Sequence, residues 1–412
     1  MQIDTPTTSA SQYGTTTSLR QWLSVVAVAV SAFAFVTAEF LPVGLLIQIA
    51  HDLGIKPGVA GLMVTTPGIM AAIFAPALIA GAGRMDRRVV FLLLTAVLLV
   101  SNVLCAIATS FPVLLAGRAL LGAALGGFWT LATAAAPRLV EPKDAAKATA
   151  TILTGVTCAT VIGVPLGTFI ASFASWRASF AATAGLVALA LIAQAFLVPS
   201  LPSASGLRVA DFKTLLRRPH TRWSLLMVAL VFGAHFSTYT YIAPLLEQDF
   251  SVRGITLLLF GFGLVGFFSN ALMSMAVANH LKKSVAAMIL LLLAAISSML
   301  LLDHSIGGEA AGMLLWGVAF GALPLCFSVW IQRGTADMPE AGSAMFVSII
   351  QVAIAAGSAV GGSIVDHAGL SADFTMGCGL AVLGLIALQR LAALERPTGK
   401  SAFVSECEPS AD

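Results

Sequence analysis

Charged side chains are scarce in this sequence, and their scarcity excludes most soluble folds. Only 10% of the 412 residues are Asp, Glu, Lys or Arg, whereas 58% are apolar; a soluble domain carries about 25% charged residues. An excess of one sign is also absent, since 22 basic and 19 acidic residues leave a net charge of +3. We therefore expect no nucleic-acid partner, which would require a concentrated basic surface.

Cysteine is sparse and scattered. Four of the five cysteines lie within apolar runs and Cys407 lies near the C-terminus, so no spacing indicates a disulfide framework or a zinc site. The segment Gly261-Phe-Gly263-Leu-Val-Gly266 fits a dinucleotide fingerprint, but it lies within a long apolar run with no preceding strand. Close helix packing explains these glycines better.

A nucleotide-phosphate loop is absent as well. Gly399-Lys400-Ser401 resembles the end of such a loop, but Leu394 occupies the position of its first glycine. We therefore expect no metal, no cofactor and no ATP, and any uphill transport must draw on an ion gradient.

Apolar runs of membrane-spanning length fill the chain between its two tails. About 370 residues, divided by roughly 30 for each crossing and its loop, predict about twelve crossings. The runs cover 22–49, 57–83, 89–109, 111–136, 146–174, 178–198, 223–246, 254–279, 284–302, 308–331, 342–365 and 372–393. We predict an all-α membrane protein with twelve transmembrane helices in contact with the lipid bilayer.

Basic residues alternate between the predicted loops, and this alternation predicts an orientation. The tails and even-numbered loops hold 18 Lys or Arg residues, whereas the odd-numbered loops hold three. Basic loops remain on the cytoplasmic side, so both termini should be cytoplasmic. The predicted parts are a disordered tail at 1–19, a six-helix half at 20–198, a cytoplasmic linker at 199–222 with an amphipathic piece at Asp211–Leu216, a second half at 223–393, and a tail at 394–412.

The two halves share an internal repeat, as transporters often do. At an offset of 194, Gly163, Gly167, Ile170, Ala178 and Phe180 recur as Gly357, Gly361, Ile364, Ala372 and Phe374. A weaker match, at an offset of 196, joins Ala38-Glu39-Phe40 to Ala234-His235-Phe236. This second match predicts pseudo-symmetric positions for Glu39 and His235.

Glu39 is the one acidic residue placed well within a span; the other acids fall in loops, tails or span ends. An ionised carboxylate at mid-bilayer costs about 2.5–3.5 kcal/mol on insertion scales. Glu39 should therefore face a wet cavity, pair with a base or hold a proton. The alternative is a glutamate at a span end that reaches interfacial water, since Pro42 and Gly44 follow it.

Arg118 is the one basic residue within a span, and the same cost applies to it. Gly122, Gly126 and Trp129 follow at helical spacing, and the glycines allow a neighbouring helix to approach closely. We predict a cation that tunes Glu39 and binds polar groups of a substrate. The alternative is an arginine that locks two helices together.

The seventh span concentrates hydrogen-bonding aromatic residues. His235 and Tyr239 share one helix face, and Tyr241 follows them. We predict proton coupling by Glu39, Arg118 and His235, and substrate binding by Trp129, Tyr239, Tyr241, Asn270, Trp330 and Gln351. For His235 and the in-span Trp, Asn and Gln residues, simple helix packing is the alternative.

Three motifs resemble those of the major facilitator superfamily, in its twelve-span drug:proton antiporter branch. They are Gly117-Arg118-Ala-Leu-Leu-Gly122 in span four, Gly163-Val-Pro165-Leu-Gly167 in span five and Gly83-Arg84-Met-Asp86-Arg87-Arg88 between spans two and three. The resemblance implies proton coupling by Arg118 and a bendable span five. Gly83 stands where the family has Asp, so Asp86 is a possible substitute in the family's gating contact.

Thr37-Ala-Glu39-Phe-Leu-Pro-Val-Gly44 is most similar to sugar and purine ribonucleoside efflux permeases. The resemblance implies a monomeric bacterial inner-membrane antiporter that exports a small neutral solute, such as a purine ribonucleoside, in exchange for protons. Efflux of an arabinose-like sugar or of drugs by the same mechanism is an alternative. A proton-linked importer is another, and an intramembrane enzyme would need a nucleophile or clustered metal ligands that the spans do not offer.

Overall fold

The computed structural model describes residues 17–82, 85–135, 138–202, 209–302 and 305–394, and every regular element in these ranges is helical. Most of the two predicted tails, together with Gly83 and Arg84 of the loop motif, lies outside the described residues. In lipid a helix satisfies all of its backbone polar groups internally, and this explains why apolar runs of this length fold as helices.

The N-terminal group of helices follows the predicted spans closely. Its elements are α1 (Leu19–Asp52), α2 (Pro57–Ala60), α3 (Leu62–Ala82), α4 (Arg87–Ala106), α5 (Phe111–Ala135), η2 (Pro142–Asp144), α6 (Ala145–Cys158), the π-helical η3 (Ala159–Gly163), α7 (Val164–Phe173) and α8 (Trp176–Leu197). The predicted fifth span is thus an α-helix that is interrupted by a π-helical turn.

The C-terminal group begins after the linker. Its elements are α9 (Val209–Arg217), α10 (Pro219–Tyr239), α11 (Ile242–Leu246), α12 (Val252–Leu301), α13 (Ile306–Gly334), α14 (Pro339–Ala368) and α15 (Leu370–Leu394). The amphipathic piece predicted in the linker is confirmed as α9. Two predicted spans run together in α12, and His280 leaves the helical conformation where they meet (φ −130°, ψ 36°).

Eleven helices in the described part of the chain are long and apolar enough to cross a membrane. The predicted seventh span, which forms α10 and α11, is not among them. It carries Arg222, His235 and several hydroxyl groups, and it is one of the most deeply buried helices. Arg222, near its start, is exposed, whereas His235 and the hydroxyl groups of Ser237 and Thr238 are buried inside the protein.

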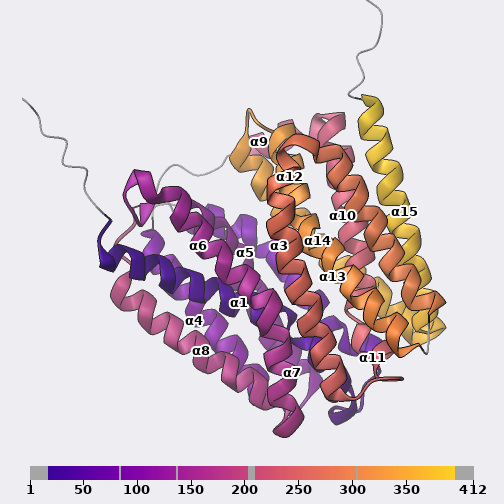
Figure 1. Ribbon diagram of the computed structural model, residues 1–412. Coiled ribbons are helices and arrows are strands. Elements are labelled where there is room, and N and C mark those ends of the chain that lie inside the picture. Colours follow the sequence, from indigo (N-terminus) through magenta and orange to yellow (C-terminus); the bar gives the residue numbers. More distant parts are fainter. Residues whose placement is uncertain (1–16, 83–84, 136–137, 203–208, 303–304, 395–412) are drawn as a thin grey trace, which may run out of the picture.

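Two large hydrophobic clusters follow the two groups of helices seen in Figure 1. One draws its buried residues from positions between Val25 and Leu201. The other draws nearly all of them from Leu215 to Leu391. Each group thus has a core of its own, which is the arrangement expected for two six-helix halves.

Glycine contacts repeat between the halves. A Cβ atom added at each of four glycines would meet the facing helix closely: Gly163 faces Thr37, Gly167 faces Leu41, Gly357 faces Gly233 and Gly361 faces Ser237. The glycines are related by the offset of 194 and the residues that they face by 196. These contacts place Glu39 and His235 at corresponding positions in α1 and α10.

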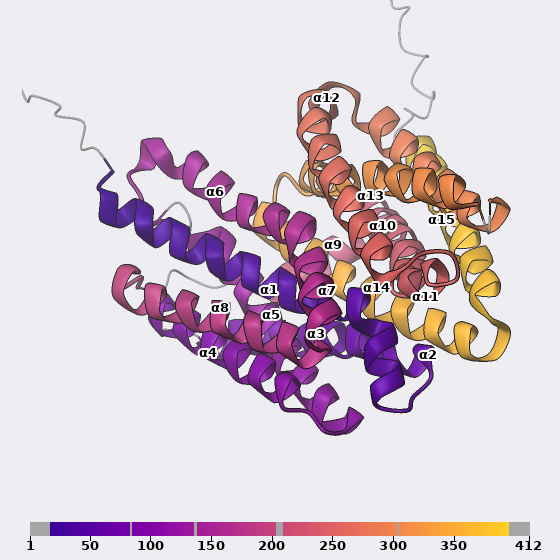
Figure 2. The same cartoon turned by 60° about the horizontal axis from the view of Figure 1, so that its bottom comes forward.

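The two halves meet at one end of the molecule, which we call the α11 end. Hydrogen bonds join them there, from Gly58 N to Asp366 Oδ1 (2.9 Å), from Tyr241 Oη to the Gly58 carbonyl (3.4 Å) and from Ser358 Oγ to the Gly61 carbonyl (3.1 Å). The groups of helices lie together near α7 and α11, whereas the starts of α1 and α6 lie far from α9 and the turn of α12 (Figures 1 and 2). The structure is therefore closed at the α11 end.

Candidate functional site

Two prolines leave backbone carbonyls without helical partners near the middle of the N-terminal half. Pro42 lies within α1 and Pro67 within α3. Proline has no N–H, so the carbonyl four residues earlier, that of Ala38 or Met63, lacks its usual donor. An unpaired buried carbonyl is costly and has to be satisfied by another group.

Arg118 satisfies both of these carbonyls. From α5 its Nη1 donates to the Ala38 oxygen (2.5 Å) and its Nε to the Met63 oxygen (2.7 Å), while Nη2 donates to the Glu39 backbone oxygen (2.7 Å). The side chain is only 1% exposed. Gly122 faces Pro67, and this close contact brings α5 near α3. Arg118 therefore locks α1, α3 and α5 together.

The Glu39 carboxyl group is buried at the contact between the two halves. It accepts a hydrogen bond at Oε1 from Nε2 of Gln351 in α14 (3.2 Å). Arg118 acts on the same carboxyl group electrostatically, although its hydrogen bonds go to backbone oxygens. Glu39 is 5% exposed, so its carboxyl lies inside the protein rather than against interfacial water.

Unused hydrogen-bonding capacity lies beside Glu39. The Oε1 atom of its partner Gln351 is buried without a hydrogen-bond partner. Buried polar atoms are normally paired, and exceptions often mark functional positions. Since the Gln351 amide offers both a donor and an acceptor, it can hold Glu39 in either protonation state.

His235 lies in an aromatic cluster formed by α10, α12 and α13. Trp316 Nε1 donates to its Nδ1 atom (2.9 Å), and the imidazole stacks on Phe320 with centroids 3.3 Å apart. A ring nitrogen that accepts a hydrogen bond belongs to a neutral imidazole. Tyr239 and Phe262 complete the cluster. The described contacts of His235 come from the C-terminal half, and they agree with the packing alternative.

The two span-seven tyrosines lie in different places. Tyr239 is in the aromatic cluster, where its ring stacks on Phe262. Tyr241 is at the α11 end, where its Oη donates to the Gly58 carbonyl of the N-terminal half (3.4 Å) and to the Ser358 carbonyl of its own half (2.8 Å). Tyr241 therefore holds the closed end together in this conformation.

The other predicted substrate contacts are dispersed. Trp330 donates to Ser224 Oγ (2.9 Å) and stacks on His220, so it fastens α13 to α10. Trp129 is partly buried with its ring edge against Phe128. Asn270 is partly buried in α12. Of the predicted substrate residues, the structure brings only Gln351 into described contact with Glu39.

The loop motif is tied to the N-terminal half. Asp86 caps α4 by accepting from Arg88 N (2.8 Å), and it also accepts from Ser200 Oγ and from Leu201 N (2.9 Å). These bonds, that of Ser200 foremost, hold the pKa of Asp86 below its usual range. Arg87 N donates to the Leu201 carbonyl (2.9 Å). The described contacts join the α3–α4 loop to the segment after α8.

The span-five motif lies where that helix deforms. The π-helical η3 ends at Gly163, immediately before the turn that contains Pro165. A π-turn and a proline are both recognised causes of helix bending. Gly167 packs closely on Leu41. In α12, Gly263 meets the backbone of Thr160 and Val161 in the other half, whereas Gly261 and Gly266 meet α13 in their own half, so the fingerprint-like glycines serve helix packing.

Two buried acids were not predicted. Glu309 and Asp373 lie in the first turns of α13 and α15 and are 1% and 0% exposed. Both belong to the acids that the sequence analysis placed in loops, tails or span ends. The internal repeat could have indicated that Asp373 is buried. Phe374, the next residue, matches Phe180, and Asp373 therefore corresponds to Ser179, which is buried as well.

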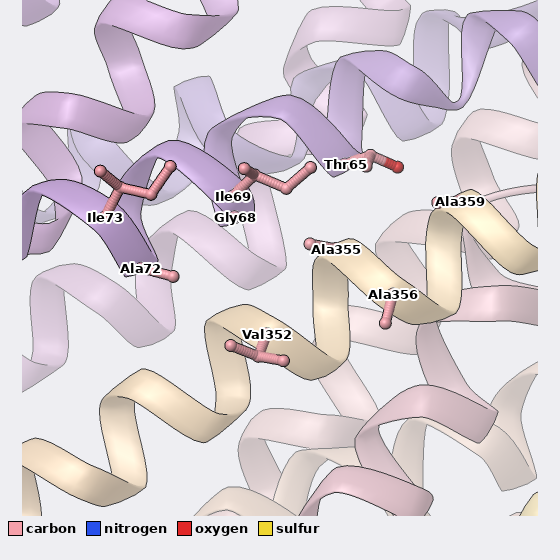
Figure 3. A pocket seen from close by; sticks show the side chains of 9 residues that line it. All are labelled: Thr65, Gly68, Ile69, Ala72, Ile73, Val352, Ala355, Ala356 and Ala359. Atoms are coloured by element: carbon pink, nitrogen blue, oxygen red, sulfur yellow. The ribbon is translucent and has the colours of Figure 1, made fainter.

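Two hollows among the described residues are lined mainly by apolar side chains. One, of about 380 Å³, lies between α3 and α14 and is shown in Figure 3; Thr65 is its only side chain with a polar atom. Its residues Ile69 and Ile73 are exposed on the outer surface. The other is lined by residues of α12 and α13. Neither hollow includes Glu39. In the described part of the chain, no group of three His, Cys, Asp or Glu residues could hold a metal ion.

Comparison with known proteins places this architecture among characterised families. The family model described as Major Facilitator Superfamily matches residues 28–348. The purine ribonucleoside efflux pump NepI of Salmonella paratyphi C (strain RKS4594) is 35% identical over 364 residues, which cover 88% of this chain and 92% of that protein. The protein of the same name from Salmonella enteritidis PT4 (strain P125109) is 34% identical over 372 residues, which cover 89% of this chain and 93% of the relative.

Solved structures share the fold at lower identity. The nucleoside transporter NupG superimposes with a TM-score of 0.71 at 15% identity and covers 91% of this chain and 99% of its own. The human organic anion transporter MFSD10 (TETRAN) gives a TM-score of 0.62 at 22% identity, with coverage of 90% and 98%. These likenesses support the predicted fold of two helical halves.

Proposed function

This chain belongs to the major facilitator superfamily, and on that premise we propose that it exports purine ribonucleosides in exchange for protons by alternating access. It is a multi-pass protein of the bacterial inner membrane and a transporter rather than an enzyme. The choice of purine ribonucleosides is supported by the printed names of the curated relatives. An arabinose-like sugar or an amphipathic drug is the alternative cargo.

The observation that carries this proposal is the hydrogen bond between Glu39 of the N-terminal half and Gln351 of the C-terminal half. It places the one deeply embedded acid of α1 where the two halves touch. In alternating access the halves rock against each other around such a site. Rocking would therefore make or break the Glu39–Gln351 contact.

Protonation of Glu39 changes what the contact can hold. The ionised carboxylate accepts from Gln351 Nε2, as the structure has it. A protonated carboxyl can instead donate to the unpartnered Gln351 Oε1. Glu39 would accept a proton when the site opens outward and release it inward, and its protonation would be coupled to departure of the substrate.

Arg118 has two roles in this transport cycle. Two of its three hydrogen bonds fix the backbone of α1 at Ala38 and Glu39. Its charge lies near the Glu39 carboxyl and favours the ionised form. The guanidinium is therefore a positioning group, which holds the proton site in place without taking up the proton.

A membrane potential supplies enough energy for useful export. One proton that moves down 100 mV releases about 2.3 kcal/mol. At about 1.4 kcal/mol for each factor of ten, this supports roughly fiftyfold accumulation. A neutral nucleoside adds no charge of its own to this balance.

Transport into everted vesicles tests the proposal. Radiolabelled inosine should accumulate when the vesicle interior is acidic, and unlabelled inosine should compete better than arabinose or an unrelated drug. Glu39→Gln should lose at least about tenfold of the gradient-driven uptake, because the amide cannot carry the proton. The matched control is Glu247→Gln, which changes an exposed acid beyond α11.

Counterflow separates a coupling defect from a folding defect. Inosine exchange without a pH gradient should persist in Glu39→Gln, since exchange needs no proton. Undiminished gradient-driven uptake in this variant would overturn the assignment of Glu39. Uptake driven by protons that move in the same direction as inosine would identify an importer instead.

A further inference from the structure

Asp373 is a buried acid for which the proposed cycle has no use. It lies in the first turn of α15 and is 0% exposed, and neither of its carboxyl oxygens has a hydrogen-bond partner. A charged carboxylate that is buried without a partner is strongly disfavoured. The neutral, protonated form is therefore the one that fits this conformation.

Among the residues that the structure describes, the titratable groups around Asp373 offer it no cation. Tyr241, after α10, lies close enough to interact electrostatically with both Asp373 and Asp366 of α14. From α13, Glu309 is buried at the same end of the bundle. His367 of α14 is exposed, and its Nδ1 atom lies against a carbonyl of its own helix.

The other two helices that pack against α15, α10 and α12, also bring no cation to Asp373 from their described residues. His235, deeper in α10, is held by Trp316 and Phe320 within the aromatic cluster. From α12, Ile296 reaches Gly377 of α15. The described surroundings of Asp373 are thus acidic, phenolic or apolar, and they favour a bound proton.

The internal repeat places a hydrogen-bond donor at the position in the N-terminal half that corresponds to Asp373. At the offset of 194, Asp373 corresponds to Ser179, whose hydroxyl donates to the Gly167 carbonyl (2.7 Å). Gly167 corresponds to Gly361, and Asp373 Oδ1 lies beside Gly361, as does the Ser237 carbonyl. A protonated carboxyl is an O–H donor like serine, whereas a carboxylate can only accept.

We propose that Asp373 is a second proton-binding site, separate from Glu39, which holds a proton while the α11 end is closed and loses it when that end opens. On opening, the O–H bond breaks and the proton passes to water at the α11 end. On closing, the carboxylate takes a proton from the same water, so this site moves no net proton across the membrane. The proposal rests on the alternating-access cycle, and it makes acid at the α11 end favour the closed state.

A distance measurement across the α11 end tests this site. Lys56 and His367 are exposed and flank the bond from Gly58 to Asp366. We would replace both with cysteine, change the native cysteines to alanine, attach spin labels and measure the label distance between pH 5 and 9. Every sample would carry Glu39→Gln, so that titration of the first site cannot contribute.

The expected result is a short distance at low pH and a growing population of long distances as the pH rises. The closed-to-open ratio should fall by up to about tenfold for each pH unit, the limit for a single proton. Asp373→Asn and Asp373→Ser should remain short throughout, because both keep a neutral hydrogen-bonding side chain. Asp366→Asn, the matched control at the same end, should keep the pH dependence.

Three outcomes would overturn the proposal. They are a ratio that does not change with pH, a pH dependence that survives Asp373→Asn, and a loss of the dependence in Asp366→Asn, which would assign the proton to Asp366. None of them bears on gradient-driven export by Glu39, because the measurement uses no substrate and no Glu39 carboxyl.

Discussion

The same position in the two halves is built in two different ways. In α1, Glu39 lies beside a backbone that Pro42 has opened and that Arg118 repairs. In α10, the corresponding residue is His235, and Thr238 stands where α1 has Pro42. The Thr238 hydroxyl donates to the carbonyl four residues earlier, in a helix that needs no outside donor (2.9 Å).

This difference shows that the two halves of a duplicated fold can keep the same packing contacts and still take different chemical roles. The glycine contacts that hold each half together are the same, whereas the chemistry at the facing residue has diverged. One half keeps an ionisable group whose partner comes from the other half. The other half fills the position with an aromatic cluster that turns His235 inward. At this pair of corresponding positions, only the N-terminal half thus offers an acid whose protonation can change during transport.

Removal of the arginine should give the largest effect, because three backbone carbonyls depend on it. Arg118→Ala should destabilise the protein by about 3–5 kcal/mol, the usual cost of removing one partner from a buried charged network. Thermal unfolding in detergent measures this loss. Arg118→Lys should retain part of the stability, since an ammonium can reach only some of the carbonyls that a guanidinium fork reaches. An unfolding temperature unchanged in Arg118→Ala would contradict the locking role.

The matching change in the C-terminal half should be milder. Trp316→Phe removes the donor to His235 Nδ1 and leaves that atom unpaired, at a cost of about 1–3 kcal/mol. The pH dependence of inosine export should stay as in the wild type, since His235 is held as a neutral packing residue. A shifted pH profile would instead assign His235 to the proton pathway and would end the contrast drawn between the halves.

A smaller effect is expected where the halves meet. Tyr241→Phe keeps the ring and loses the bond across the halves to the Gly58 carbonyl (3.4 Å), together with the bond to the Ser358 carbonyl of its own half. One neutral hydrogen bond contributes about 0.5–1.5 kcal/mol, so the closed-to-open ratio should fall roughly twofold to tenfold. The spin-label pair described above measures this ratio at fixed pH. A ratio equal to that of the wild type would remove Tyr241 from the closing contact.

The smallest effect concerns one acid in a loop of each half. The pKa of Asp86 is lowered, chiefly by Ser200, and that of Asp337 by Arg218. A lowered pKa means that the stabilisation is present at neutral pH and is lost as the pH falls below about 4. Asp86→Asn should therefore lower the unfolding temperature slightly at pH 7 and have less effect at pH 3.

Asp337→Asn should change less than Asp86→Asn at every pH. Its partner is the exposed Arg218 (2.6 Å), and exposed ion pairs contribute little. Asp86 also holds a backbone N–H at the start of a helix and the segment after α8. Equal effects of the two variants would contradict this ranking.

The sequence predicted the helices well because lipid imposes a simple rule on them. The length of the apolar runs, and the Gly, Pro and charged residues that bound them, located nearly every span. They also located the break near His280, between two of the predicted spans. Hydropathy does not predict which polar groups contact one another inside the protein. Hydropathy does not reveal that Arg118 bonds to carbonyls freed by Pro42 and Pro67, because that depends on how three helices cross.

Long-range contacts set the other limit. Gln351 and Glu39 are 312 positions apart, and only the rocking arrangement of the halves brings them together. Asp373 falls at a span end, where sequence alone does not separate a solvated acid from a buried one. The internal repeat indicates the position of Asp373 in the fold. Phe374, the residue after Asp373, matches Phe180, so the repeat aligns Asp373 with Ser179.

Counting protons on substrate binding tests the central claim most directly. Purified protein in weakly buffered detergent solution, with a pH-indicator dye, would receive inosine near neutral pH. If Glu39 exchanges its proton for substrate, the wild type should release about one proton for each nucleoside bound, and Glu39→Gln should bind inosine and release none. Equal proton release by the two proteins, or none by the wild type while it binds inosine, would contradict the account.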